Sequence, residues 1–546
     1  MNSLKPMLLT CLKSYNKSQF IKDVTAGVIV AIIALPLSIA LALASGVGPE
    51  AGIFTAIVAG FVISALGGSC VQIAGPTAAF ATIVAGIVAR DGMDGLIIAT
   101  IMAGIFLILM GLFHFGSLIK FIPYTITTGF TSGIAVTIVI GQLKDFFGIT
   151  YPAGVKPIET TEKMKAFVRN ISSANTDALI VGVVSLAILI LAPYIFKKVP
   201  GSLIAVIVGI LMVQFLPLKV STIGNLYTIS NSLPSFHMPV IRFSTISASV
   251  SNAFTIAVLA AIESLLSCVV ADGMINSKHR SDMELVAQGA GNIASSLFGG
   301  IPATGAIART AANIKNGGRT PIAGMVHSVT LIIVLVVLMP YAGMIPMPTI
   351  AAILFIVAYN MCQWRTFRDL VRTAPKSDIL VLIVTFVLTV VFDLVVAIEI
   401  GMVLACLLFI KRMSEETHAD SWVYTDDDTP DIDEHLQKLP LQIRVYEITG
   451  PLFFGAADAI EHIVVKDFTR CLVLRMRGVP ALDSTAMNAL QNLVKTCASK
   501  GITLVFSHVN EQPMHVMEKA GFVELVGKEN FQSNISAALK RAEEVI

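Results

Sequence analysis

The sequence predicts an all-α membrane protein with fourteen transmembrane segments and a separate α/β domain at its C-terminal end. Hydrophobic residues make up 55% of the 546 residues and charged residues only 14%, whereas a soluble protein has about 25% charged residues. The deficit of charge lies before about Ile410, where apolar runs long enough to cross a bilayer follow one another. The rest of the chain has the composition of a soluble domain.

The expected transmembrane segments follow in chain order. They cover residues 24–44, 50–67, 75–89, 95–113, 119–140, 176–195, 201–217, 251–274, 284–298, 304–314, 321–340, 347–361, 377–392 and 394–411. The third and the tenth are too short to cross the ~30 Å hydrocarbon core as helices. Asp393 and Glu399 mark a tight turn between the last two segments, where we expect a structural role for both.

Loop charges orient these segments and set the domain boundaries. An even number of segments puts both termini on one side, and the short loops on that side carry the lysines and arginines, which indicates the cytoplasm. The basic residues of these loops are Lys197, Lys198, Lys278, Arg280, Lys315, Arg319, Arg365, Arg368, Arg372 and Lys376. The predicted organisation is a cytoplasmic arm (1–22), a transmembrane domain (23–412, with halves of about 23–217 and 250–412), an acidic linker (413–439) and an α/β domain (440–546).

Alternating patterns after the linker predict the elements of the α/β domain. They are strands at 441–449, 471–476 and 503–507, and helices at 458–465, 484–499, 513–520 and 531–541.

The two short segments indicate an internal repeat. The third begins Gly75-Pro76-Thr77-Ala78-Ala79 and the tenth begins Pro302-Ala303-Thr304-Gly305-Ala306, at matching places in halves of seven segments. Because seven is odd, the second half must run inverted in the membrane. Helices that start in mid-membrane present unpaired N–H groups and positive dipole ends, which together bind an anion. The alternative is that the glycines only allow close helix packing.

Ionisable and hydroxyl side chains inside the segments are candidate functional residues. Glu263 has two interpretations, a site for a coupling cation or proton and a structural hydrogen-bond anchor. Arg309 either contacts the anion or pairs with a carboxylate such as that of Glu263. Thr77 and Thr310 either contact the substrate or bond the local backbone. We expect Asp272, Asp282 and Glu284 to be solvated, and His327 to serve packing or hydrogen bonding.

The sequence contains no motif typical of an enzyme. It has no Walker-type loop, HExxH or Gly-x-Ser-x-Gly, which favours secondary transport or a channel over an ATP-driven pump. No cysteine and histidine cluster predicts a metal site or a disulfide framework, and a net charge of +2 does not indicate nucleic acid as a partner. We therefore expect no cofactor beyond a coupling proton or sodium ion.

Several motifs together resemble the SulP (sulfate permease) family of anion transporters, with a C-terminal STAS domain. In the transmembrane part they are Asp23-Val-Thr-Ala-Gly27 with Leu35-Pro36, Gly75-Pro76-Thr77, Glu284 to Asn292 followed by Gly299-Gly300, and Arg309-Thr310. In the C-terminal domain they are Gly450-Pro451-Leu452-Phe453-Phe454 and Asp483-Ser484-Thr485.

The resemblance implies a 7+7 inverted repeat with a core domain (segments 1–4 and 8–11) and a gate domain (5–7 and 12–14). It also implies elevator-like transport, a homodimer in the plasma (inner) membrane, and an anion held between the third and tenth segments. The residues implied around the anion are Leu37, Leu41, Thr77, Ala78, Ala79, Gly305, Ala306, Ala308 and Arg309.

In sodium-coupled bicarbonate members, the positions that match Glu263, Ser267, Gly305 and Ala306 build a cation site. A glutamate rather than an aspartate at the first position favours proton coupling. Leu37 and Ala308 stand where many animal members have polar residues, so the site offers few side-chain donors. Sulfate, bicarbonate and four-carbon dicarboxylates all remain open as substrates, and the alternatives are an anion channel, a sodium-coupled bicarbonate transporter and a nucleobase transporter.

In stand-alone STAS regulators, which this domain resembles, the serine of the Asp-Ser-Thr motif is phosphorylated. Ser484 matches that serine and stands at the N-terminus of an expected helix, where phosphate is favoured electrostatically. The alternative is that Ser484 is only the N-cap of that helix. We expect the domain to serve regulation, assembly or the binding of a cytoplasmic partner.

Overall fold

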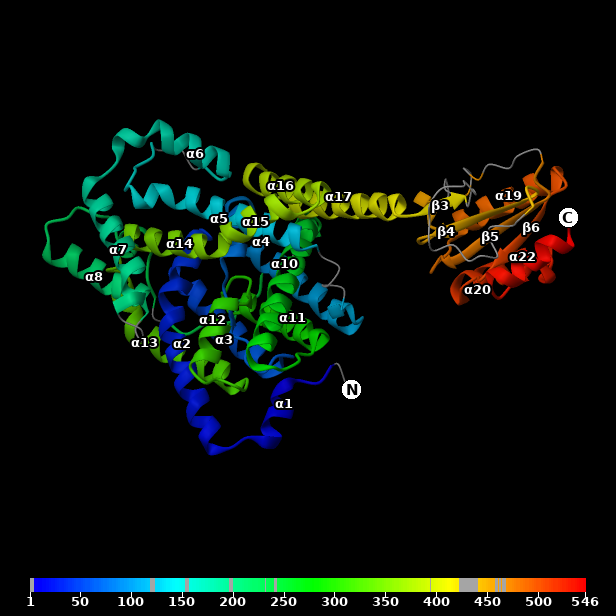
Figure 1. Ribbon diagram of the computed structural model, residues 1–546. Coiled ribbons are helices and arrows are strands. Elements are labelled where there is room, and N and C mark those ends of the chain that lie inside the picture. Colours follow the sequence, from blue (N-terminus) through cyan, green and yellow to red (C-terminus); the bar gives the residue numbers. More distant parts are fainter. Residues whose placement is uncertain are drawn as a thin grey trace. The chain divides into compact units, whose positions relative to one another are not determined.

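The computed structural model describes residues 4–117, 123–152, 157–195, 200–230, 232–239, 243–392, 394–421, 440–456, 460, 463 and 468–546 of the chain. These residues form two compact units, Met1–Met402 and Val403–Ile546, and Figure 1 gives the labels of their elements. Lys197, Lys198, Asp393 and the expected helix at 458–465 lie outside the described residues or largely so.

The first unit is helical. Its helices are α1 (Met7–Cys11), α2 (Lys17–Ala44), α3 (Pro49–Leu66), α4 (Ala81–Leu112), α5 (Tyr124–Phe146), α6 (Thr160–Arg169), α7 (Thr176–Ile195), α8 (Gly201–Phe215), α9 (Ile223–Leu226), α10 (Phe243–Ile275), α11 (Ser281–Leu297), α12 (Ile307–Lys315), α13 (Ile322–Ala342), α14 (Met347–Cys362), α15 (Trp364–Thr373) and α16 (Lys376–Val391). Helix α17 (Leu394–Glu415) begins in the first unit and ends in the second. Among the described residues, eight helical stretches are long and apolar enough to cross a membrane.

Each expected transmembrane segment corresponds to a helix or to part of one. The third and fourth segments share α4, which breaks at Gly92, where φ is 70°. The tenth segment is α12, whose nine residues span only about 14 Å at 1.5 Å per residue. The third and tenth segments therefore do not cross the whole helical unit, and one end of each lies inside it.

The helices pack in two groups, as the resemblance implies. One group consists of α2, α3, α4, α10, α11, α12 and α13, in which α4 packs on α10 and α11, and α13 on α2 and α3. The other contains α5, α7, α8, α14 and α16. Close packing in the first group depends on Gly104 and Gly289, since a Cβ on either would press into the backbone oxygen of the other.

Two short strands join the halves of the first unit. Strand β1 (Ala74–Gly75) pairs antiparallel with β2 (Thr304–Gly305), with Ala74 opposite Gly305 and Gly75 opposite Thr304. The N–H of Ala306 also donates to the carbonyl oxygen of Ile73 at 2.9 Å. Because corresponding segments of the two halves meet antiparallel, the pairing fits the inverted repeat.

The second unit is an α/β domain with a five-stranded sheet in the order β3-β4-β5-β6-β7. The strands are β3 (His418–Ser421), β4 (Ile443–Thr449), β5 (Cys471–Gly478), β6 (Thr503–Ser507) and β7 (Phe531–Gln532), and the helices after β5 are α19 (Ser484–Ser499), α20 (Glu511–Lys519), α21 (Phe522–Val526) and α22 (Ile535–Glu544). Strands β4 to β7 are parallel, and only β3 is antiparallel.

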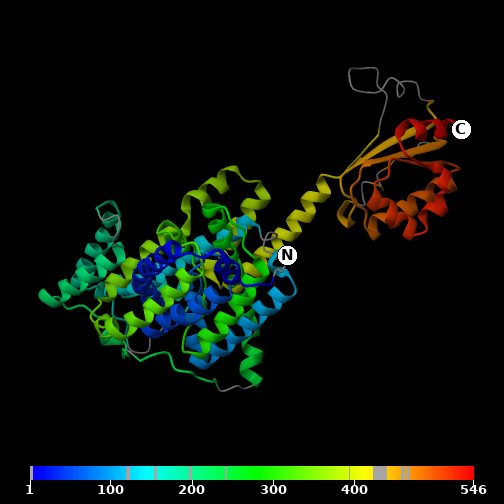
Figure 2. The ribbon, with the colours of Figure 1, turned by 90° about the horizontal axis from the view of Figure 1, so that it is seen from below.

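Helices cover both faces of this sheet (Figure 2), because successive strand residues point to opposite sides. Ile448, Leu474 and Phe506 pack with α19 on one face. Val473 and Val505 pack with α22 on the other.

Two differences from the sequence-based expectation concern short strands. Residues 413–421, expected in the linker, form the end of α17 and the edge strand β3. Phe531, expected in a helix, lies in β7, where its ring stacks on Phe506 at 4.9 Å. Both strands depend on sheet partners that are remote in sequence, which no local pattern reveals.

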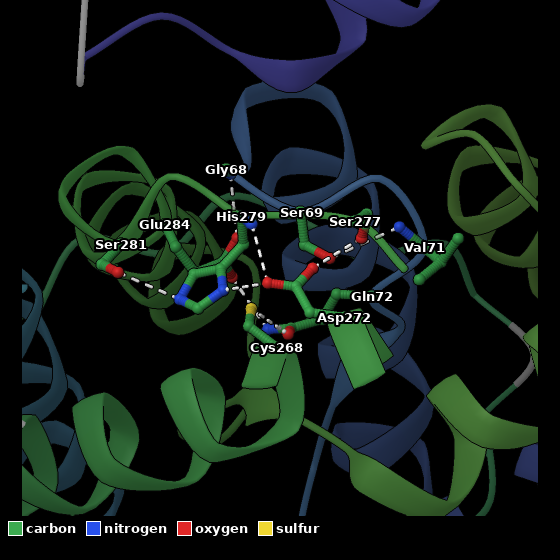
Figure 3. A network of polar contacts seen from close by, with 10 residues as sticks. All are labelled: Gly68, Ser69, Val71, Gln72, Cys268, Asp272, Ser277, His279, Ser281 and Glu284. Carbon is green, nitrogen blue, oxygen red and sulfur yellow. Dashed lines mark hydrogen bonds and ion pairs between the residues drawn. The ribbon is translucent and has the colours of Figure 1, made fainter. Parts of the chain in front are cut away.

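The expectation that Glu284 and Asp272 are solvated was wrong. Glu284 is fully buried in the first turn of α11, and Figure 3 shows it within a polar network. Its carboxylate accepts hydrogen bonds from Gly68 N, Gln72 Nε2, Ser264 Oγ and Gln288 Nε2, at 2.8–3.0 Å. Asp272 accepts from Ser277 Oγ and from the backbone and ring of His279.

Replacing Glu284 with Ala should destabilise the first unit by about 3 kcal/mol, because four buried donors lose a charged acceptor. Thermal unfolding of the purified protein in detergent checks this. Asp369→Ala is the matched control, since Asp369 forms an exposed ion pair with Arg368, and such pairs contribute little. An equal loss of stability in the two variants would contradict the anchoring role of Glu284.

Candidate functional site

The site lies where the two interrupted segments face each other. Thr77 has extended backbone and precedes the short helix η2 (Ala78–Phe80), which leads into α4. On the opposite segment, Ala306 is the N-cap of α12. The first N–H groups of a helix have no intrahelical acceptor, so both segments present N–H donors beyond the β1–β2 pairing.

Arg309 reaches across from α12 to the other segment. Its side chain is buried, with a relative exposure of 2%, and its Nη2 donates to the carbonyl oxygen of Pro76 at 2.5 Å. Nε and Nη1 have no hydrogen-bond partner within the described part of the chain. The ion pair with Glu263 that was one sequence-based alternative is not formed.

Gly75 makes room for this guanidinium. A Cβ at Gly75 would collide with Nη1 of Arg309, and Cα of Ala56 lies on the same side at 3.6 Å. A side chain at the glycine of the Gly-Pro-Thr motif would therefore displace the guanidinium of the arginine from the other repeat.

Glu263 and Thr77 interact directly. Thr77 Oγ1 donates to Glu263 Oε2 at 2.8 Å, and both side chains are half-buried. The sequence placed these residues in different repeats, 186 positions apart, with no indication that they meet. The contact joins the candidate coupling residue on α10 to the first residue before η2.

Thr310 and Ser267 form hydrogen bonds of their own, separate from the contact between Glu263 and Thr77. Thr310 Oγ1 accepts from the N–H of Ile73 at 3.0 Å, and Ser267 Oγ donates to Thr310 Oγ1 at 3.4 Å. Thr310 thus holds the backbone of the opposite segment, which differs from the bond to its own local backbone that was expected as the alternative to substrate contact.

The remaining expected residues differ in accessibility. Leu41, Ala78, Ala79 and Gly305 are buried, and Leu37 and Ala306 are half-buried. Ala308 is exposed in the first turn of α12, which packs against α2, the helix of both leucines. Figure 1 shows α12 beside α2.

Sequence reasoning missed the residues that hold the interrupted segments. Asn292 bonds the backbone of Ala303 through both amide atoms, at 2.8 and 2.9 Å. Asn313 Nδ2 donates to the carbonyl oxygen of Val71, and Thr304 Oγ1 donates to that of Ala260, each at 2.9 Å. The sequence signal that could have found the asparagines is a polar amide side chain within an apolar segment, because such a group needs hydrogen-bond partners inside a membrane.

His327 is buried on α13, and neither of its ring nitrogens has a hydrogen-bond partner among the described residues. Of the two roles expected for it, this leaves packing.

Ser484 is exposed as the first residue of α19. The N-cap is Asp483, whose Oδ1 accepts from Ala486 N at 2.9 Å, so the alternative that Ser484 is the N-cap was wrong. An exposed hydroxyl at a helix N-terminus is chemically suited to phosphorylation, which stays a prediction.

Comparisons with known proteins agree with this architecture. The sulfate permease family matches residues 20–385 and the STAS domain matches residues 438–538. "Putative sulfate transporter YvdB" of Bacillus subtilis is 39% identical, with 95% of this chain and 97% of the relative covered. "Bicarbonate transporter BicA" of Picosynechococcus sp. is 32% identical, with 95% and 94% covered.

Solved structures give the same fold. The murine anion transporter Slc26a9 in the inward-facing state matches with a TM-score of 0.89 at 18% identity, over 99% of this chain and 94% of that chain. The transmembrane domain of a cyanobacterial bicarbonate transporter, BicA, matches with a TM-score of 0.62 at 29% identity, over 72% and 98%. The relatives are named as transporters and not as enzymes.

Gly75→Ala should lower anion affinity by about tenfold or more, because its Cβ displaces a guanidinium whose charge-assisted hydrogen bonds contribute about 1.5–3 kcal/mol each. Titration calorimetry with sulfate, bicarbonate and succinate measures the effect on whichever anion the wild type binds. Gly86→Ala, on α4 with nothing within 4 Å of the new Cβ, is the control. Wild-type affinity in Gly75→Ala would show that the anion does not depend on Arg309.

Proposed function

The chain belongs to the sulfate permease family of anion transporters, and from this we propose that it is a proton-coupled symporter of a small oxyanion. The anion binds between η2 and α12, in contact with Arg309. The observation that carries the proposal is that two nitrogens of this buried guanidinium, Nε and Nη1, have no hydrogen-bond partner among the described residues.

A buried guanidinium with free donors requires a counter-ion or acceptor, because desolvating an unpaired charge costs several kcal/mol. Its planar fork matches two oxygens of a carboxylate, carbonate or sulfate. The N–H groups at the starts of η2 and α12 add donors without added charge. Such a site needs few polar side chains, which fits Leu37, Leu41 and Ala308 around it.

Proton coupling follows from the hydroxyl of Thr77, which has one donor hydrogen. When Glu263 is ionised, Thr77 donates that hydrogen to the carboxylate, as in the observed contact of 2.8 Å. When Glu263 is protonated, its own O–H donates to Thr77 Oγ1, and the threonine hydrogen is released towards the anion. Protonation also removes a negative charge that repels the substrate. Proton and anion therefore favour each other's binding.

For the movement that carries the anion across, we propose an elevator in which the helix group holding β1, β2 and α12 shifts against the group of α5, α7, α8, α14 and α16. The site is built from the first group, which supports motion as a body. We further propose a homodimer in the plasma (inner) membrane with both termini in the cytoplasm, supported by the basic loops on one side. The STAS domain then faces the cytoplasm and is available to a partner or to phosphorylation at Ser484.

Purified protein in liposomes should accumulate labelled sulfate, bicarbonate or succinate when a proton gradient is imposed. Glu263→Gln should abolish accumulation while anion binding is partly retained and no longer depends on pH, since the amide cannot exchange a proton. Uptake is measured under proton and sodium gradients, with and without membrane potential. Accumulation driven only by sodium would replace the proton in the proposal, and large unitary currents without saturation would identify a channel.

Thr77→Val removes the hydroxyl and nearly keeps the volume of the side chain. It should therefore weaken the link between proton binding and anion binding. We expect anion affinity in this variant to change with pH at least about fivefold less than in the wild type, a coupling loss of about 1 kcal/mol. Thr100→Val is the control, because Thr100 Oγ1 bonds only the local backbone oxygen of Leu96. An undiminished pH dependence in Thr77→Val would remove the hydroxyl from the coupling mechanism.

A further inference from the structure

Two cysteines from distant parts of the sequence meet outside the transmembrane segments. Cys11 is the last residue of α1, and Cys70 lies in the turn between α3 and β1. Their Sγ atoms are 3.6 Å apart, across 59 positions of sequence. Both residues are half-buried, so the pair is held by the fold and still open to small reagents.

Hydrogen bonds fix the N-terminal arm beside this turn. Met7 N donates to the carbonyl oxygen of Gly67 at 2.8 Å. Arg280 Nη1 donates to the carbonyl oxygen of Lys5 at 2.8 Å, and its Nη2 donates to Thr10 Oγ1 at 3.0 Å. These hydrogen bonds hold the N-terminal arm against the turn and thereby keep the two thiols close together.

The two thiols differ in acidity. The hydrogen bond between Cys11 and Cys70 lowers the pKa of Cys11, with a smaller contribution in the same direction from the Arg280 guanidinium, while burial and Asp23 act against it. The pKa of Cys70 is raised, chiefly by its hydrogen bond with Cys11 and by burial. Cys11 is therefore the better nucleophile of the pair.

We propose that Cys11 and Cys70 form a reversible disulfide that fastens the N-terminal arm to the turn leading into β1. A bonded S–S distance is about 2.05 Å, so the sulfurs must close by about 1.5 Å.

The oxidant is a low-molecular-weight disulfide of the glutathione type. The Cys11 thiolate attacks one of its sulfurs, forms a mixed disulfide and releases one thiolate. The released thiolate takes the proton of Cys70, the Cys70 thiolate attacks Cys11 Sγ, the protein disulfide forms, and the second thiolate leaves. The two electrons of the protein thiols reduce the oxidant to two thiols, which take up the two protons.

The link restrains the segment that carries the anion site. Cys70 is followed by Val71, whose carbonyl oxygen accepts from Asn313, and by Ile73, whose N–H donates to Thr310 Oγ1. Both partners lie on α12. Tying this turn to the arm limits its displacement, and we expect slower transport in the oxidised protein. In a reducing compartment such a bond is transient, which suits a redox-sensitive modification.

Mass spectrometry of the full-length protein in proteoliposomes tests the bond itself. After exposure to oxidised glutathione and blocking of free thiols, a non-reducing digest should contain a peptide pair joined through Cys11 and Cys70. Dithiothreitol should release it, and Cys11→Ser and Cys70→Ser should both lack it. Cys406→Ser is the control and should keep it, since Cys406 lies on α17. Absence of the linked pair from a digest that contains Cys11 joined to glutathione would overturn the proposal.

Uptake measured on the same samples tests the consequence. Oxidation should slow uptake at least about twofold in the wild type, reversibly with dithiothreitol, and should leave the two serine variants unchanged. If all of the protein carries the Cys11–Cys70 disulfide and uptake is unchanged, the proposal that this disulfide slows transport is overturned. The peptide readout needs no transport, so failure of the proposed symport is distinguishable from failure of the disulfide.

Discussion

The architecture of the first unit depends on pairing the backbone of two interrupted segments inside an apolar environment. Unwound backbone at membrane depth is tolerated only where its polar groups are satisfied. Here β1 and β2 satisfy each other through two residues on each side, and Ala306 N bonds Ile73 O beyond them. Side chains from neighbouring helices, such as Asn292 and Asn313, complete the set.

This pairing decides which groups are left for the proposed anion site. The strands consume the donors before each short helix, so the helix starts and the guanidinium of Arg309 remain. Because Arg309 belongs to one repeat and bonds Pro76 of the other, the site exists only when both repeats are in place. Glu263 enters it through Thr77, which connects a carboxylate on α10 to the same small region.

Two buried carboxylates hold the turns that lead to these segments. Glu284 binds the turn at Gly68, before β1. Asp23, also fully buried, accepts from Arg319 N and from Thr320 Oγ1, in the turn after α12. Within the part of the chain that the structure describes, each carboxylate has several donors and no cation bonded to it, so hydrogen bonds rather than ion pairs offset the desolvation of its charge.

Local chemistry in the sequence determined the helical class, the segment positions, the inverted repeat and the identity of Glu263, Arg309 and Thr77 as polar exceptions. Periodicity, helix length and Gly-Pro interruptions depend on residues that are close in the sequence, so the sequence alone reveals them. Only the tertiary structure decided that Glu263 meets Thr77 rather than Arg309, that Glu284 is buried, and that β3 and β7 are strands. These outcomes depend on which donors and sheet edges the fold brings together from distant parts of the sequence, and no local sequence pattern predicts such contacts.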